Sequence, residues 1–269
     1  MESDLDVVAR LRAAGCVFAE EEASILLGTA HTRAELLAMV ERRADGEPLE
    51  QVVGWAEFCG LRIFVDRVVF VPRRRSEFLV SVAVGLVRSR GESAPPVIVD
   101  LCCGTGALGL AVAAELGRGD AATGAELHAA DLDPAAVACA RRNVEPAGGR
   151  VHQGDLFSAL PLGLRGRVDV LICNAPYVPT TEIAFMPTEA REHEALMALD
   201  GGADGLTVLR RVTADARAWL AAGGVLLVET SERQAPSMAA AMSAAGLTAE
   251  VREDDDWGAV VVTGSANGR

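Results

Sequence analysis

The apolar run Val168-Asp169-Val170-Leu171-Ile172-Cys173 leads directly into Asn174-Ala175-Pro176-Tyr177. The run predicts a buried strand, and the polar and aromatic residues after it predict a loop at the strand's end. Pro176 has no backbone N–H and pushes Ala175 toward extended backbone. The side-chain carbonyl of Asn174 and the backbone carbonyl of Ala175 are then held in fixed directions. Beside the ring of Tyr177, two such hydrogen-bond acceptors can bind a flat NH2 group.

Strand-like and helix-like segments alternate around this run from Pro96 onward. The predicted strands are 97–101, 126–130, 150–153, 168–173 and 225–229, followed by an antiparallel pair at 247–252 and 259–263. The predicted helices between and after them are 107–116, 133–143, 204–220 and 236–245. This order predicts an α/β fold with a doubly wound, mostly parallel, seven-stranded sheet covered on both faces. Ligands of such sheets bind outside the carboxyl ends of the strands.

Polar residues and glycines gather at these predicted strand ends. They are Asp100, Gly104 and Gly106 after the first strand, Asp131 after the second, Asp155 after the third and Asn174 after the fourth. An acid after the second strand suits two ribose hydroxyls. Asp155 beside apolar Leu156 suits an adenine, because a carboxylate accepts from the exocyclic amine while an apolar side chain covers the ring. The alternative is that the acids cap helices and brace turns.

Composition narrows the classes of partner. The chain has 269 residues, is 50% hydrophobic and carries a formal net charge of −13, which argues against a broad phosphate-binding surface. Its basic residues are all arginines, so lysine chemistry is excluded. Six cysteines without C-x-x-C spacing predict reduced thiols, and the histidines show no ligand spacing, so we expect no metal. The N-terminus resembles no signal peptide and no apolar run is long enough to span a membrane, so we expect a cytoplasmic protein.

The first part of the chain differs in character. Residues 4–54 predict short helices, with a capping box at Thr32 and Glu35 opening the third. Strand-forming residues between 55 and 72 predict a β-hairpin. We therefore expect a small N-terminal helical domain, 1–54, a β-hairpin linker, 55–75, and the α/β domain, 76–269.

The turn Asp100-Leu101-Cys102-Cys103-Gly104-Thr105-Gly106 is neither G-x-G-x-x-G nor a P-loop. It resembles the nucleoside-binding turn of S-adenosylmethionine-dependent methyltransferases. Together with Asn174-Ala175-Pro176-Tyr177, the resemblance narrows to enzymes that methylate a planar nitrogen and carry the motif Asn/Asp-Pro-Pro-Tyr. Two classes use that motif: adenine amino-methyltransferases and protein glutamine N5-methyltransferases.

Three further stretches resemble the second class. They are Pro48-Leu49-Glu50-Gln51-Val52-Val53-Gly54 with Glu57-Phe58-Cys59-Gly60-Leu61, then Val71-Pro72-Arg73 with Ser76-Glu77, and then Glu189-Ala190-Arg191-Glu192-His193-Glu194 with Ala198-Leu199-Asp200-Gly201-Gly202-Ala203-Asp204-Gly205. The resemblance runs from about Pro48 to Gln234. It identifies the chain as a member of the release-factor glutamine N5-methyltransferases or a close paralogue.

That resemblance implies a Rossmann-like methyltransferase sheet and S-adenosylmethionine as cofactor. The implied substrate is the Gly-Gly-Gln glutamine of a peptide chain release factor, bound by a monomer without nucleic acid or membrane. The implied catalytic residues are Asn174, Ala175, Pro176 and Tyr177, which with Arg73 also bind the substrate. The implied cofactor-binding residues are Asp100, Cys102, Gly104, Gly106, Asp131, Leu132, Asp155, Leu156 and Asn174. The alternatives are an adenine amino-methyltransferase and a catalytically impaired paralogue that binds the cofactor.

The chain departs from the family pattern in three places. Ala175 replaces the first Pro of the motif, and Cys102 replaces the first Gly of the cofactor turn. Arg74-Arg75-Ser76-Glu77 stands where Pro-Glu-Thr-Glu is usual. The run Arg73-Arg74-Arg75 fits an anion site or a solvated helix start equally well. We assign structural roles to His193 and Glu229.

Overall fold

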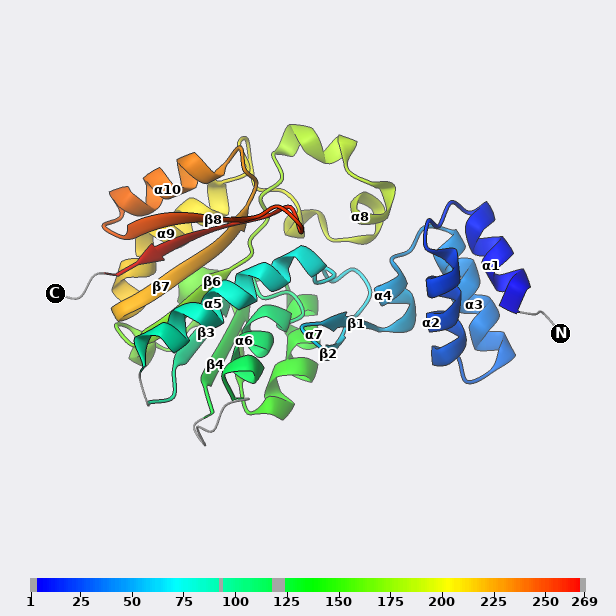
Figure 1. Ribbon diagram of the computed structural model, residues 1–269, viewed down its shortest axis with the longest axis horizontal. Coiled ribbons are helices and arrows are strands. Elements are labelled where there is room, and N and C mark those ends of the chain that lie inside the picture. Colours follow the sequence, from blue (N-terminus) through cyan, green and yellow to red (C-terminus); the bar gives the residue numbers. More distant parts are fainter. Residues whose placement is uncertain (1–3, 92–93, 118–123, 267–269) are drawn as a thin grey trace.

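The seven-stranded sheet dominates the computed structural model, which describes residues 4–91, 94–117 and 124–266 (Figure 1). Its strand order is β5-β4-β3-β6-β7-β9-β8. The strands are β3 (Val97–Leu101), β4 (Glu126–Asp131), β5 (Arg150–Gln153), β6 (Val168–Cys173), β7 (Leu220–Thr230), β8 (Thr248–Asp254) and β9 (Ala259–Ser265). The first five pair in parallel, whereas β9 runs antiparallel to both β7 and β8. The predicted sheet and its final antiparallel pair are confirmed.

Helices cover both faces of this sheet, and each face has its own apolar core. One face carries α5 (Glu77–Arg90), α6 (Ala107–Gly117) and α7 (Pro134–Val144), and the other carries α9 (Thr207–Trp219) and α10 (Ala235–Ala244). The central strands β3 and β6 are almost wholly buried, as expected for parallel strands covered on both sides. The crossover order and the two cores make the sheet doubly wound.

Four helices form the N-terminal part, at the opposite end of the molecule from the C-terminus (Figure 1). They are α1 (Asp4–Ala13), α2 (Ala19–Thr29), α3 (Arg33–Ala44) and α4 (Leu49–Val53), and they share a small apolar core of their own. Thr32 and Glu35 form the predicted capping box of α3. Gly54 closes α4 in the left-handed conformation, which glycine adopts without strain. The division of the chain into domains at 54 and 75 stays a prediction.

The predicted hairpin is shorter than its sequence pattern indicated. The strands β1 (Trp55–Phe58) and β2 (Leu61–Phe64) pair antiparallel, but the apolar stretch after them forms no third strand. Val68 has a φ of 60°, a left-handed conformation that interrupts an extended chain. Residues 65–73 instead pass along the sheet's carboxyl edge, where Val68 makes an isolated bridge to Glu194. The predicted hairpin is therefore present over residues 55–64, and the segment after it contributes to the site.

The remaining element, α8 (Thr188–His193), lies in the long connection between β6 and α9 (Figure 1). We call residues 179–200 of this connection the strap. Within the described residues, no helix is long and apolar enough to cross a membrane.

Candidate active site

A cavity of about 540 Å³ opens at the carboxyl ends of β3, β4 and β6. The strap and the segment after the hairpin supply its other walls. The predicted site residues that line it are Arg73, Cys102, Gly104, Asp131, Leu132, Asp155, Leu156, Asn174, Ala175, Pro176 and Tyr177. Asp100 and Gly106 are not among its lining residues. One cavity therefore brings together the residues predicted for the cofactor and those predicted for the acceptor.

Asp100 and Gly106 support the turn that borders the cavity without lining the cavity themselves. Asp100 is fully buried and accepts a hydrogen bond from the backbone N–H of Gly109 at 2.9 Å, while its other oxygen has no partner in the part of the chain that the structure describes. Burial raises the pKa of Asp100 to about 7. A Cβ on Gly106 would lie 2.6 Å from Val144, so its glycine is required by packing against α7. Gly104 differs, because a Cβ there would approach only Phe70, at 4.0 Å.

Asp131 shapes the cofactor turn as well as lining the cavity. One carboxylate oxygen accepts from the backbone N–H of Gly104 and the other from that of Asp133, both at 2.9 Å. Burial raises its pKa. Leu132 beside it is 53% exposed, an apolar side chain left open at the cavity. Asp131 thus both holds the turn and lines the cavity. Its interpretation as an acid that braces a turn is therefore compatible with its interpretation as an acid that binds a ligand.

Asp155 forms an ion pair with Arg211 on α9 at 2.6 Å, and both side chains are about half exposed. An exposed pair of this kind contributes little to stability and can rearrange around a ligand. Leu156 follows in a left-handed backbone conformation, with φ 48°, and is half-buried at the cavity.

The loop after β6 is held by the segment that ends the strap. The backbone of Val178 pairs with Leu199 and Gly201, at 3.1 and 2.9 Å. A Cβ on Gly205 would lie 2.2 Å from the carbonyl oxygen of Tyr177, and the side-chain amide of Gln234 donates to that oxygen at 2.9 Å. The glycines at 201–205 therefore serve close backbone packing that fixes the Asn174–Tyr177 loop.

Two carboxylates, from Glu194 and Glu229, hold the arginines of this site. Glu194 has a fully buried side chain, accepts from the backbone N–H of Val71 at 3.3 Å and pairs with Arg73 at 2.5 Å. Burial raises the pKa of Glu194, against the opposing effect of Arg73. Arg75 pairs with Glu229 at 3.0 Å.

The neighbouring Arg74 lies over the ring of Trp257, with its guanidinium carbon 5.4 Å from the ring centroid. The three consecutive arginines thus point to three different partners. They do not form one open anion site.

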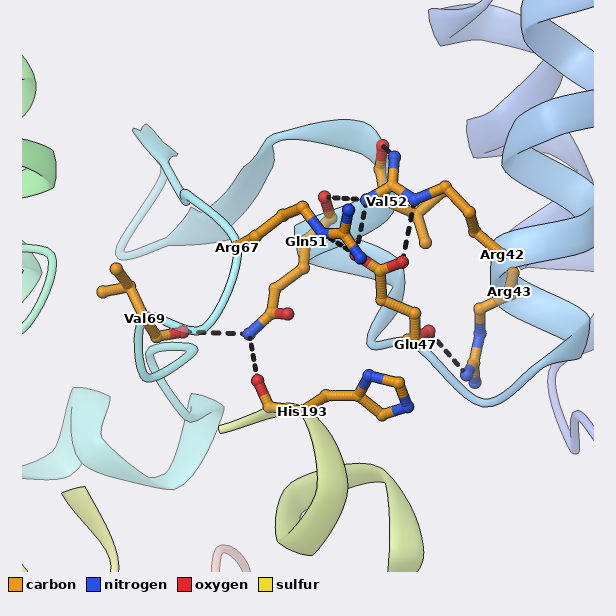
Figure 2. A network of polar contacts seen from close by, with 8 residues as sticks. All are labelled: Arg42, Arg43, Glu47, Gln51, Val52, Arg67, Val69 and His193. Atoms are coloured by element: carbon orange, nitrogen blue, oxygen red, sulfur yellow. Dashed lines mark hydrogen bonds and ion pairs between the residues drawn. The ribbon is translucent and has the colours of Figure 1, made fainter. Parts of the chain in front are cut away.

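The N-terminal helices reach the strap through Gln51 on α4. Figure 2 shows its side-chain amide donating to the carbonyl oxygens of Val69, at 3.1 Å, and His193, at 3.3 Å. Beside it, buried Glu47 pairs with Arg42 and Arg67. Gln51 is itself 4% exposed, so these hydrogen bonds are shielded from water. His193 contributes its backbone here, in line with the structural role predicted for it.

Sequence reasoning missed four side chains at this site: Arg75, Ser76, Glu194 and Glu229. Arg75 was noted as part of an arginine run and as a departure from the family stretch, and Ser76 as part of a family-like stretch, but neither was assigned to the site. Glu229 was assigned a structural role, although it lies near the carboxyl end of a central strand, where the other site acids were found. The same strand-end rule would have found it. The strand-end rule does not reach Glu194, which follows α8; its only signal was its place in the family-like stretch Glu189–Glu194.

Comparison with known proteins agrees with this geometry. A family model described as "Methyltransferase small domain" matches residues 86–202. A release factor glutamine methyltransferase of Streptomyces coelicolor is 39% identical over 73% of this chain and 67% of its own length. Another, of Deinococcus radiodurans, is 39% identical over 80% of this chain and 73% of its own length.

A relative with a different named substrate is also similar. It is a 4-amino-L-phenylalanine/4-methylamino-L-phenylalanine methyltransferase of Streptomyces pristinaespiralis, 37% identical over 77% of this chain and 69% of its own length. Among solved structures, a methyltransferase of Pyrococcus furiosus matches with a TM-score of 0.53 and 14% identity, over 84% of this chain and 97% of its own. This last likeness shows the Rossmann-like methyltransferase fold.

Proposed function

The chain belongs to the family of release factor glutamine methyltransferases, and from this we propose that it methylates the side-chain amide nitrogen of a glutamine in a peptide chain release factor. The observation that carries the proposal is that Asn174, Ala175, Pro176 and Tyr177 lie in the same cavity as the cofactor turn. A methyl donor and a flat methyl-accepting group can therefore meet in this cavity. The proposed substrate places the reaction in the cytoplasm.

The cavity fits S-adenosylmethionine as methyl donor. Its volume is in the range of pockets for ligands of this size. Gly104 leaves its side of the cavity open, the Asp131 carboxylate suits ribose hydroxyls, and Leu132 and Leu156 offer apolar walls for an adenine. When bound, this cofactor supplies a methyl group on a positively charged sulfur.

The residues around the methyl-accepting nitrogen explain how a weak nucleophile can react. An amide lone pair is delocalised into its carbonyl, so orientation is the main demand. The Asn174 side-chain oxygen accepts one N–H and the Ala175 carbonyl the other, and both stabilise positive charge developing on the nitrogen. Bound S-adenosylmethionine would supply the methyl group for the new N–CH₃ bond and keep the electron pair of the broken S–CH₃ bond on its sulfur. The amide proton then leaves to water, so no strong base is required.

The charges around the cavity favour an uncharged acceptor. Each arginine that lines the described cavity already has a carboxylate partner: Arg73 with Glu194, Arg75 with Glu229 and Arg211 with Asp155. A glutamine side chain needs no counter-charge, whereas the carboxylate of a free amino acid does. A nucleic-acid acceptor is disfavoured by the net charge of −13.

Labelled S-adenosylmethionine, purified release factor and mass mapping of the Gly-Gly-Gln peptide test the proposal. We expect one methyl group on that glutamine and none on a release factor in which it is replaced by Ala. 4-Amino-L-phenylalanine in a parallel reaction tests the second named activity among the relatives. Methylation of the free amino acid alone, by protein with a competent cofactor complex, would overturn the release-factor proposal. Cofactor binding with turnover of neither acceptor would indicate the catalytically impaired paralogue.

A further inference from the structure

The hydroxyl of Tyr177 is held between two charged side chains. It donates to a carboxylate oxygen of Glu229 at 3.1 Å and accepts from an Nη of Arg75 at 2.7 Å. Arg75 and Glu229 also contact each other, Nε to Oε1, at 3.0 Å. The three groups come from the loop after β6, the short 3₁₀ turn Arg74–Ser76 before α5, and the end of β7. They form a closed triangle, and Arg75 and Tyr177 line the cavity.

We propose that Arg75 and Glu229 are positioning residues that clamp the hydroxyl of Tyr177, so that its ring is a fixed wall against the flat acceptor group. The proposal rests on the proposed function, since it assigns the ring to the acceptor. It also excludes the hydroxyl from the chemistry, because the only phenolic proton is donated to Glu229.

Because Glu229 is buried, its contacts with Tyr177 and Arg75 are needed to offset the cost of burying its charge. Glu229 is 2% exposed, and its second oxygen has no partner among the described residues. A buried carboxylate with one free oxygen is costly unless its other contacts are charge-assisted, and Arg75 supplies such a contact. Burial and Glu229 raise the pKa of Tyr177 to about 12, although Arg75 opposes them. The phenol therefore stays neutral and keeps its donor role at physiological pH.

Arg75 is one of the residues by which this chain departs from its family pattern, in which this position is usually Glu. A carboxylate here would face Glu229 with like charge and could not donate to a phenol oxygen. The guanidinium does both tasks at once, through Nε and Nη in its planar fork. Its neighbour Arg74 lies over Trp257 and is absent from the cavity lining, so it is a matched control of the same residue type.

The clamp can be observed directly because Tyr177 is the only tyrosine in the chain. Protein grown with 3-fluorotyrosine reports on this one side chain by ¹⁹F NMR. In Arg75→Met and Glu229→Gln we expect the signal to move toward that of the unfolded chain and to sharpen, while Arg74→Met leaves it in place. Equal spectra for Arg75→Met and Arg74→Met, in folded protein, would overturn the clamp. This readout needs no turnover, so it decides the clamp even where release-factor methylation fails.

The catalytic consequence is tested by a double-mutant cycle on methyl transfer. Misplacing a reacting group's surroundings lowers kcat by roughly tenfold to hundredfold, and we expect Arg75→Met and Tyr177→Phe each to do so. Because both remove the same contact, the double variant should be no slower than the worse single variant. Multiplicative losses in kcat would overturn the positioning role. A loss in Arg74→Met equal to that in Arg75→Met would do the same.

Discussion

The side-chain amide nitrogen of Asn174 lies 3.5 Å from the hydroxyl oxygen of Ser76. Ser76 is buried, at the start of α5, and so ties the first helix of the α/β part to the loop after β6. With its nitrogen turned toward Ser76, Asn174 has its carbonyl oxygen available for the substrate N–H that we propose it accepts.

Replacing Asn174 by Ala should remove one of the two acceptors that orient the substrate nitrogen. We expect kcat to fall roughly 10²- to 10³-fold, as for loss of one preorganised hydrogen-bonding group. Calorimetry should show that the variant still binds the cofactor, since the other predicted cofactor residues, among them Gly104 and Asp131, are untouched. Methylation at the wild-type rate by this variant would contradict the role assigned to Asn174.

Ser76 offers a graded test of the same contact. In Ser76→Ala the amide loses its anchor but keeps its carbonyl, so we expect a smaller loss in kcat, roughly tenfold. Ser76→Thr retains the hydroxyl and should stay within about twofold of wild type. Steady-state kinetics of both variants measure this, and equal losses would show that size at position 76, rather than the hydroxyl, matters.

Gln51 should control how firmly the strap is held. Gln51→Leu leaves the carbonyl oxygens of Val69 and His193 without their donor, at a cost of about 1–3 kcal/mol of stability. We expect a higher KM for the protein substrate with cofactor affinity unchanged, because none of the predicted cofactor-binding residues lies in the strap. Trypsin reports on the strap specifically, since the chain has no lysine and Arg191 is the only arginine between residues 174 and 209. Cleavage after Arg191 should be faster in the variant, and an unchanged rate would contradict the role of Gln51 in holding the strap.

The buried acid behind the cofactor turn predicts a pH dependence of stability. Asp100 has a pKa of about 7 in the folded protein against 3.8 for an unperturbed acid, so the folded state binds its proton more tightly. Its contribution is full below pH 3.8 and is lost as pH rises toward 7, by at most about 4 kcal/mol. Urea unfolding at pH 5 and pH 8 should therefore show a larger drop for wild type than for Asp100→Asn. If the free energy of unfolding changes equally with pH in wild type and Asp100→Asn, the pH dependence comes from other groups. Asp131 and Glu194 are among them, since their pKa values are also raised.

The sheet was predictable because its strands are short apolar runs separated by strong turn signals. β5, at Arg150–Gln153, and the antiparallel pair β8–β9 lie where periodicity put them. The stretch after the hairpin was not predictable in this way. Its apolar residues are buried by contacts that only the tertiary structure supplies: Val65 and Val71 cluster with Ala56 of β1, and Val69 with Ala136 and Cys139 of α7.

The site was predictable where a residue follows a strand, and not where it depends on a partner far away in sequence. Asp131 and Asn174 belong to the first kind. The pairs Arg73–Glu194 and Arg75–Glu229 belong to the second, since each joins the segment before α5 to a distant element. No local pattern specifies which carboxylate an arginine will meet.

Ala175→Pro restores the family motif and separates two roles of that position. The acceptor assigned to residue 175 is its backbone carbonyl, which proline retains. The backbone N–H, which proline lacks, is directed at the Cys173 sulfur, a weak acceptor. Ala175 is 2% exposed and lines the cavity, so the added ring atoms would have to lie toward the cavity. We therefore expect kcat within about threefold of wild type and a gain of about 0.4–1 kcal/mol in the free energy of unfolding, because proline restricts the unfolded chain. Urea unfolding and release-factor methylation measure the two quantities. A variant that is stabilised yet inactive would show that the acceptor pocket itself is shaped around alanine, and the carbonyl would then be insufficient to explain catalysis.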